Sequence, residues 1–244
     1  MNNIMVIFKR EFVAYFTTPI AYVFLVIFVF LSGIFAFYLG DFFDRGQADL
    51  ASFFAFHPWL YLFLIPALAM RLWAEERREA TIELLFTLPI TMGQAVVGKF
   101  LAAWAFTGIA LALTFTMWAT VNYLGSPDNG IILAGYIGSL LMAGAFLSIG
   151  SCMSALTRNQ VIAFIMSAVI GLAFVLSGFP LVLDFFSNWA PEILVQAIGS
   201  FSFLSHFDAI SKGVIDLRDV VYFASLIAFW LFANVVLIEL KKAD

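Results

Sequence analysis

Long runs of uncharged, mostly apolar residues alternate with short clusters of charge along this chain. A helix needs about 20 apolar residues to cross the hydrocarbon core of a bilayer. The gaps between charges therefore predict six transmembrane helices, at about residues 19–39, 57–74, 95–123, 131–155, 160–180 and 219–239. The expected fold is an all-α integral membrane protein, with residues 1–244 forming one transmembrane domain.

The residues before the first span have a different pattern. Within 2–18, Ile4, Phe8, Phe12 and Tyr15 recur at helical spacing among polar residues. This spacing is typical of an amphipathic helix that lies in the membrane interface. A plain lead-in to the first span is the alternative.

The segment at about 181–215 fits a span less well. Its uncharged part, Ile193 to Phe207, is short for a crossing and is broken by glycine and serines. We expect an extracytoplasmic or re-entrant segment that dips into or lies on the outer leaflet. A seventh span is the alternative, and it would move Lys241 to the side opposite the amino terminus.

Basic residues set the expected orientation, because short cytoplasmic loops are enriched in lysine and arginine. With six spans, nine of the 12 basic residues lie on one side and three, Arg45, Lys212 and Arg218, on the other. Both termini and residues 75–89 are therefore predicted to be cytoplasmic.

Composition agrees with a lipid environment. The chain is 64% hydrophobic and 11% charged, whereas soluble domains have about 45–50% apolar and 25% charged residues. The predicted spans carry no charge through their centres, which disfavours coupling to an ion gradient and a membrane-embedded enzyme.

Few residues suggest chemistry within the chain. Cys152 is the single cysteine, and we interpret it as a small packing residue. Gly98-Lys99 is followed by Phe100 and lacks the glycine spacing of a phosphate-binding loop. His57 and His206 are isolated, so we interpret both as interfacial residues with local hydrogen bonds near the outer face, a pH-sensing or substrate role being the alternative. No catalytic, cofactor or metal site is predicted.

Small residues recur in the fourth predicted span, which favours close approach of helices. A share of a substrate path or a dimer seam is the alternative. The residues that we assign to packing or to a path are Gly135, Gly138, Ser139, Gly144 and Ser148.

The densest run of charge lies at residues 75–89, between two spans. As one helix ended by Pro89, it would place Ile82, Leu85 and Phe86 on one face and stack two glutamates on another. Apolar anchors on a charged cytoplasmic helix favour docking into a groove of a soluble partner. A solvated helix resting on lipid headgroups is the alternative.

These residues resemble a known motif. Glu75-x-x-Arg78-x-Ala80-Thr81-x-Glu83-x-Leu85, followed by Leu88-Pro89, is similar to the charged motif of type-2 (ABC-2) ABC transporter permeases. The six-span layout with an amphipathic first helix is also similar, and the closest resemblance is to gliding-motility-type permease subunits. Ala80 departs from the motif, which usually has glycine there.

The resemblance implies a type V exporter-like permease of the bacterial inner membrane that pairs with a second, identical or homologous permease. A separate ATP-binding subunit would hold ATP and Mg²⁺, so this chain is expected to be no enzyme and to bind no cofactor. Residues 75–89 would be the coupling helix, and residues 156–160 a second contact. The expected ATPase-contact residues are Glu75, Arg78, Glu79, Thr81, Ile82, Glu83, Leu85, Phe86, Pro89 and Arg158.

Other expected partners are the lipid bilayer and a possible accessory periplasmic or membrane subunit, with no nucleic acid. The competing hypothesis is an ATP-independent membrane scaffold or assembly factor that recruits a soluble partner through the same helix.

Overall fold

A computed structural model describes residues 3–87 and 89–241. Every regular element in those ranges is helical. The elements of the first half are α1 (Asn3–Thr17), α2 (Pro19–Ile34), η1 (a π-helix, Phe35–Leu39), α3 (Ala51–Ala55), α4 (His57–Ala69), α5 (Arg71–Arg78), α6 (Ile82–Thr87), α7 (Met92–Leu113) and α8 (Phe115–Leu124). The elements of the second half are α9 (Asn129–Leu156), α10 (Gln160–Leu176), α11 (Pro180–Ser187), α12 (Glu192–Ser200), α13 (Phe203–Ser211) and α14 (Leu217–Leu240).

Helix α9 forms the centre of the bundle. It packs against α4, α5, α7, α10, α13 and α14. Its small residues allow these neighbours to approach closely. At Gly150, for example, an added Cβ would lie 2.4 Å from the Cβ of Ala69 in α4. The central helix is therefore the element on which the others are assembled.

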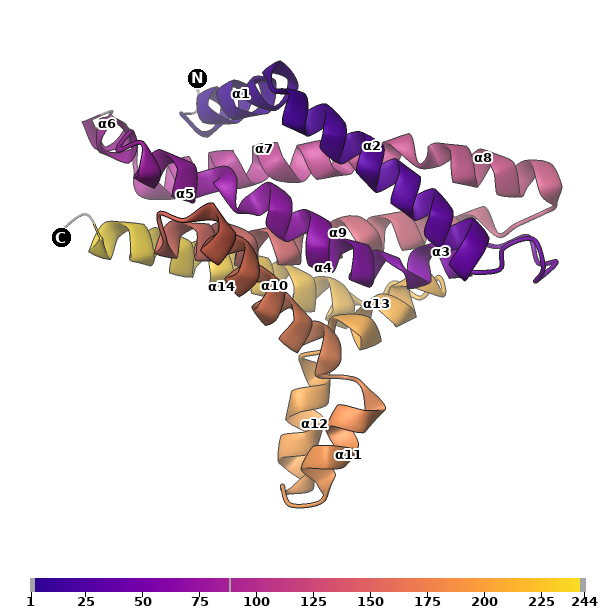
Figure 1. The fold of residues 1–244 in the computed structure, drawn as a ribbon. Coiled ribbons are helices and arrows are strands. Elements are labelled where there is room, and N and C mark those ends of the chain that lie inside the picture. Colours follow the sequence, from indigo (N-terminus) through magenta and orange to yellow (C-terminus); the bar gives the residue numbers. More distant parts are fainter. Residues whose placement is uncertain (1–2, 88, 242–244) are drawn as a thin grey trace.

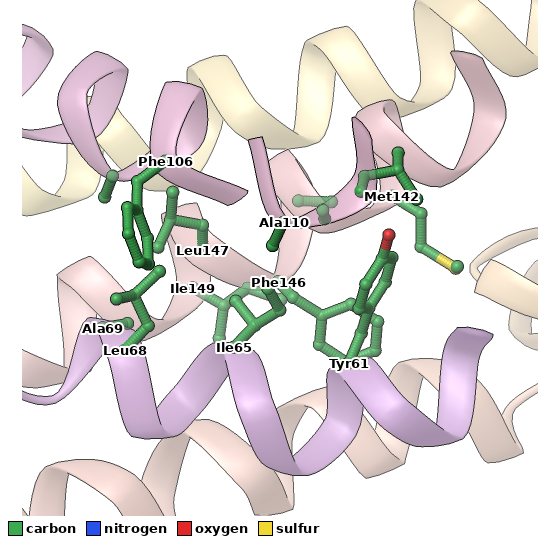
Figure 2. Close-up of a cluster of buried hydrophobic side chains, with 14 of the residues drawn as sticks. Tyr61, Ile65, Leu68, Ala69, Phe106, Ala110, Met142, Phe146, Leu147 and Ile149 are labelled. Atoms are coloured by element: carbon green, nitrogen blue, oxygen red, sulfur yellow. The ribbon is translucent and has the colours of Figure 1, made fainter. Parts of the chain in front are cut away.

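The core lies between α4, α7 and α9 (Figure 2). Tyr61 and Ile65 of α4 point toward Phe146 of α9, and Phe106 of α7 closes one end of the cluster (Figure 2). All four side chains are at most 1% exposed. Because lipid is as apolar as these side chains, dispersion contacts and shape matching hold such a core together.

Four helical segments are long and apolar enough to cross a membrane: Pro19–Leu39, Met92–Leu124, Asn129–Leu156 and Leu217–Leu240. Two bent pairs, α10 with α11 (75°) and α12 with α13 (58°), raise the number to as many as six if each pair is one span. The described ranges thus contain four to six candidate spans. The predicted span at 57–74 is not one of the four, because α4 is only 13 residues long and the helix is interrupted at Met70 before α5.

The predicted extracytoplasmic or re-entrant segment is built from three short helices. Helices α11 and α12 form a hairpin that projects sideways from the bundle (Figure 1), and neither has a buried residue. Helix α13 instead packs on the body through Phe203, Phe207 and Ile210. The uncharged run from Ile193 to Phe207 therefore straddles the bend between α12 and α13.

Helix α1 occupies nearly all of the segment predicted as the first helix. It packs along α7, with Ile7 buried at the contact. A Cβ added at Gly98 would lie 2.8 Å from Cγ2 of Ile7, so the glycine allows α1 to lie directly on α7. This contact fixes the start of the chain to the bundle.

Candidate functional site

The charged segments gather at one end of the bundle. Helices α1, α5 and α6 lie there together with the last turns of α14 (Figure 1). The Asn3 amide donates to Gln94 Oε1 at 3.2 Å, and the Lys241 ammonium donates to the carbonyl of Leu156. The start of α1, the start of α7, the end of α9 and the end of α14 therefore lie at one surface, which we call the charged end.

Residues 75–89 form two helices instead of the single predicted helix. Helix α5 ends at Arg78, and α6 begins at Ile82. Between them, Ala80 adopts a left-handed conformation with φ of 56°, and the Thr81 N–H donates to the carbonyl of Glu76 at 3.0 Å. This is a Schellman motif, which satisfies carbonyls at the end of a helix and reverses the chain. The expectation of one helix with Glu79 and Glu83 stacked on it is wrong, because the turn separates them.

The turn gives a physical reason for glycine at the position of Ala80. A left-handed conformation costs about 1–2 kcal/mol for a residue with a Cβ and little for glycine. The departure from the motif noted in the sequence thus falls on the one residue of the turn that has positive φ.

The α5–α6 turn presents several predicted contact residues to solvent. The side chains of Arg78 and Glu79 are 58% and 54% exposed. Exposed residues also include Thr81, Glu83, Pro89 and, on the neighbouring loop, Arg158. These residues form an accessible surface on which a soluble partner could bind.

Four other predicted contact residues are not among these exposed residues. Ile82 is 9% exposed and belongs to the hydrophobic core, so its side chain packs inside this chain instead of projecting as an apolar anchor, and its contact with an ATPase stays a prediction. Its side chain stabilises α6 against the bundle. The side chains of Leu85 and Phe86 lie outside the part of the chain that is described. Glu75 forms an ion pair within its own helix, since its carboxylate accepts hydrogen bonds from the Arg71 guanidinium at 2.9 and 3.0 Å.

The second predicted contact loop lies near the first. Burial and the positive charge of Arg158 together hold the pKa of Arg77 below its ordinary value. Helix α5 also packs on both α9 and α10, the helices that this loop joins. A partner that covers the α5–α6 turn could therefore also reach Arg158.

A buried lysine, which sequence reasoning did not assign to a site, joins three helices at the charged end. Lys99 of α7 is only 3% exposed, and its Nζ lies 2.8 Å from Glu76 Oε1 and 3.4 Å from Glu11 Oε2. It also lies 5.1 Å from the centre of the Trp73 ring. A buried ammonium requires such partners, since an unpaired buried charge is very costly. The signal in the sequence was a single charge near the end of an otherwise apolar span.

The electrostatics of Glu11 follow from this cluster. Burial disfavours its charged form, but Lys99 and the neighbouring Arg10 more than offset this effect. Together they hold the pKa of Glu11 below its ordinary value of 4.5. The carboxylate is therefore charged at neutral pH and fixes α1 to α7.

A hydrogen-bond network continues from this cluster into the bundle. The indole of Trp73 donates to Ser151 Oγ at 3.1 Å, and the Asn234 amide donates to the same oxygen at 2.7 Å. The hydroxyl of Ser154 donates to the carbonyl of Met70 at 2.8 Å and accepts from the backbone N–H of Trp73 at 3.0 Å. Helix α5, which leads to the exposed turn, is thus bonded to α9 and through it to α14.

The small residues predicted for packing or a path lie at helix contacts. Added Cβ atoms at Gly135 and Gly138 would approach Phe54 at 2.4 Å and Ile210 at 2.7 Å. At Gly144 the nearest atom would be in Ile227, at 2.9 Å. Ser139 and Ser148 are fully buried. The three glycines therefore lie at close helix contacts and the two serines are buried, while a share of a substrate path or a dimer seam stays the alternative.

The two histidines differ from each other. His57 is fully buried, and its Nδ1 lies 2.7 Å from Oγ of Ser139 on α9. The interpretation of His57 as an interfacial residue with local hydrogen bonds is therefore wrong. His206 is partly exposed, and its two ring nitrogens lie 2.5 Å from Asp219 Oδ1 and 3.0 Å from the carbonyl of Ser200. Its contact with Ser200 is local, whereas the one with Asp219 joins α13 to α14.

Comparison with known proteins identifies a family that covers nearly all of the chain. A family model described as "ABC-2 family transporter protein" matches residues 5–238. The chain belongs to the ABC-2 transporter family. The family-level resemblance drawn from residues 75–89 is confirmed, while its gliding-motility-type refinement stays a prediction. A search of curated proteins found no match to the chain.

Membership in the ABC-2 family indicates the kind of partner with which such a protein works. ABC-2 permeases are membrane components rather than ATPases, and they normally work with an ATP-binding subunit. With four to six apolar spans, this ABC-2 protein is a multi-pass membrane component.

Proposed function

We propose that this ABC-2 protein is the permease subunit of an ATP-driven exporter in the bacterial inner membrane, with six spans and both termini in the cytoplasm. A second permease, identical or homologous, would complete the translocation path. A separate ATPase, with its ATP and Mg²⁺, would bind the α5–α6 turn. The observation that carries the proposal is the exposed, charged turn between α5 and α6 in a chain of this family.

The contacts behind the turn would transmit its movement. A partner that pushes on α6 moves α5, because the core side chain of Ile82 and the Schellman turn connect the two helices. Helix α5 in turn is bonded to Ser151 and Ser154 of α9. Lys99 joins the same helix to α7 and α1. Closure of two ATPases would therefore act on the central helix and on the helix that enters the membrane interface.

The gliding-motility type, the outward direction and an accessory periplasmic or membrane subunit form the finer part of this proposal. They rest on the resemblance of the motif at 75–89. The competing function is an ATP-independent scaffold that uses the same exposed turn. Both functions need the turn to be accessible, so the identity of the bound partner distinguishes them.

A charge reversal tests the contact. Glu83→Lys is expected to weaken association with the ATPase at physiological salt, because it reverses a charge on the exposed turn. Asp44→Lys is the matched control, since Asp44 is also exposed and lies in the loop that follows the first span. The measurement is the amount of ATPase subunit that co-purifies from native membranes, together with the ATPase rate of the complex.

The proposal fails if Glu83→Lys and Asp44→Lys recover the same amount of ATPase as the wild type. Deletion of 79–86 provides a second measurement, and it is expected to abolish the association. The scaffold function would be favoured if the wild type co-purified with a partner that does not hydrolyse nucleotide and if deletion of 79–86 abolished recovery of that partner.

A further inference from the structure

The charged end contains a cavity whose lining changes from charged to apolar. Its volume is about 390 Å³, and it lies between α1 and α2 on one side and α4 and α5 on the other, with Lys99 of α7 at its polar part. This volume is within the range of about 300–1,000 Å³ that is typical of small-molecule sites. We propose that the cavity binds a membrane amphiphile whose headgroup carries a protonated amine.

The polar part of the cavity calls for a hydrogen-bond donor. Glu76 uses Oε1 to hold Lys99 at 2.8 Å, while its Oε2 is buried and has no hydrogen-bond partner among the described residues. An unsatisfied buried acceptor of this kind destabilises the fold, and more so when it is charged. Glu76 lines the cavity and its side chain is 21% exposed, so a rotation of its carboxylate would let a ligand donate to Oε2 and recover this energy.

The charges around Glu76 select the kind of donor. The polar lining contains three carboxylates and two cationic side chains, so its formal charge is −1, and these residues are Glu11, Glu75, Glu76, Arg71 and Lys99. Both cations already have carboxylate partners, Arg71 in Glu75 and Lys99 in Glu76. Arg10 pairs with Glu11 from outside the lining. An anionic headgroup would therefore meet no cation that lacks a carboxylate partner among the lining residues, whereas an ammonium group could donate to Glu76 Oε2.

The apolar part of the cavity fits a hydrocarbon chain. Val23, Phe24 and Ile27 of α2 face Leu64 and Leu68 of α4 across it. Val23 is 56% exposed and Ile27 is 40% exposed, so the apolar part is accessible from outside the protein. Because α2 belongs to one of the four long apolar helices, the accessible side would open to lipid.

The geometry favours an amphiphile over a second copy of the chain. The polar and apolar parts are continuous within one cavity, and they match the two halves of a lipid molecule. An apolar helix of another copy would cover Val23 and Ile27 but would leave Glu76 Oε2 without a donor. Lipid binding also requires no ATPase, so its failure would leave the ATPase contact of the α5–α6 turn untouched.

Native mass spectrometry of the detergent-solubilised full chain tests this site. The chain would be incubated with mixed micelles that contain either phosphatidylethanolamine, which has an amine, or phosphatidylglycerol, which is anionic and has none. We expect at least about tenfold more retained phosphatidylethanolamine, equivalent to about 1.4 kcal/mol.

Two tryptophan variants make the test specific to the cavity. Ile27→Trp fills its apolar part and is expected to reduce retention of phosphatidylethanolamine about tenfold. Val26→Trp adds the same side chain at the preceding position of α2, which is 67% exposed and does not line the cavity, and is expected to retain the lipid as the wild type does. Glu76→Gln is expected to reduce the preference for the amine-bearing lipid, and the tryptophan pair keeps the test valid if Glu76→Gln fails to fold.

Equal retention of the two lipids would overturn the proposal, as would equal effects of the two tryptophan variants. If Ile27→Trp instead changed the oligomeric state and left lipid retention unchanged, the cavity would be an interface between copies of this chain. That result would also overturn the proposal.

Discussion

At the scale of single residues, Ala80 shows how a local conformation determines a preference in sequence. Its φ of 56° closes the turn between α5 and α6 and separates Glu79, which directly follows α5, from Glu83 of α6, both of them exposed. The resemblance at 75–89 could be drawn from the sequence, but the turn could not, since alanine is a strong helix former and favours continuing the helix.

Substitution of this alanine by glycine should therefore stabilise the chain. We expect Ala80→Gly to raise the free energy of unfolding by about 1 kcal/mol, because glycine removes the cost of the left-handed conformation. Ala14→Gly is the matched control, since Ala14 is exposed within α1, where glycine should cost about 1 kcal/mol. Thermal unfolding in detergent would measure both, and a lower melting temperature for Ala80→Gly would contradict the prediction.

The ion pair between Glu11 and Lys99 predicts a dependence on pH. The folded-state pKa of Glu11 lies below its ordinary value of 4.5, so its ionised form stabilises the fold fully above that pH. The contribution disappears as the pH falls through the folded-state pKa. Glu11→Gln should therefore lower the melting temperature at pH 7, and its difference from the wild type should shrink as the pH decreases below 4.5.

The control for this measurement is Glu239→Gln, which changes an exposed carboxylate near the end of α14. Its difference from the wild type should stay small over the same range. A difference between Glu11→Gln and the wild type that stays constant down to pH 3.5 would show that the ion pair does not stabilise the fold.

At the scale of elements, the small residues of α9 determine how closely its neighbours pack. The sequence indicated close helix approach in this span but not the partners, which come from α3, α4, α13 and α14. The same helix carries Ser151 and Ser154, whose hydroxyls bond α5 and α14. Packing and polar contacts on α9 thus determine the position of the helix that leads to the exposed turn.

Two glycine substitutions separate packing from helix propensity. Gly150→Ala should destabilise the bundle by about 1–3 kcal/mol, since its Cβ would lie 2.4 Å from that of Ala69 and α4 would have to move. At Gly33 an added Cβ meets no atom within 4 Å, so Gly33→Ala should stabilise α2 by up to about 1 kcal/mol. Thermal unfolding of the two variants would contradict this account if both shifted in the same direction.

At the scale of the whole molecule, the number of crossings decides which surfaces face the cytoplasm. The four long apolar helices are joined by shorter ones whose role in crossing depends on the bilayer. Helices α3, α4 and α5 together connect the loop after the first span to the exposed turn. Whether this connection crosses the membrane determines the side on which the α5–α6 turn lies.

Cysteine labelling tests this topology directly. With Asp44→Cys and Glu83→Cys, each in an otherwise natural chain, a membrane-impermeant maleimide should label residue 44 only from outside and residue 83 only from the cytoplasmic side. The natural Cys152 is buried and provides the background measurement. Labelling of both positions from the same side would show that α3–α5 do not cross, and the six-span arrangement would be wrong.

The sequence alone determined that lipid is the solvent of this protein, that its fold is helical and that its family is ABC-2. These properties depend on average hydrophobicity and on a local motif, which can be read along the chain. Only the tertiary structure decided that Lys99 joins Glu11 to Glu76, that His57 bonds Ser139, and that a cavity lies between α1, α2, α4 and α5. Each of these features joins residues far apart in the chain, and apolar spans contain little sequence information on which helix packs against which, because lipid and protein interior are equally apolar.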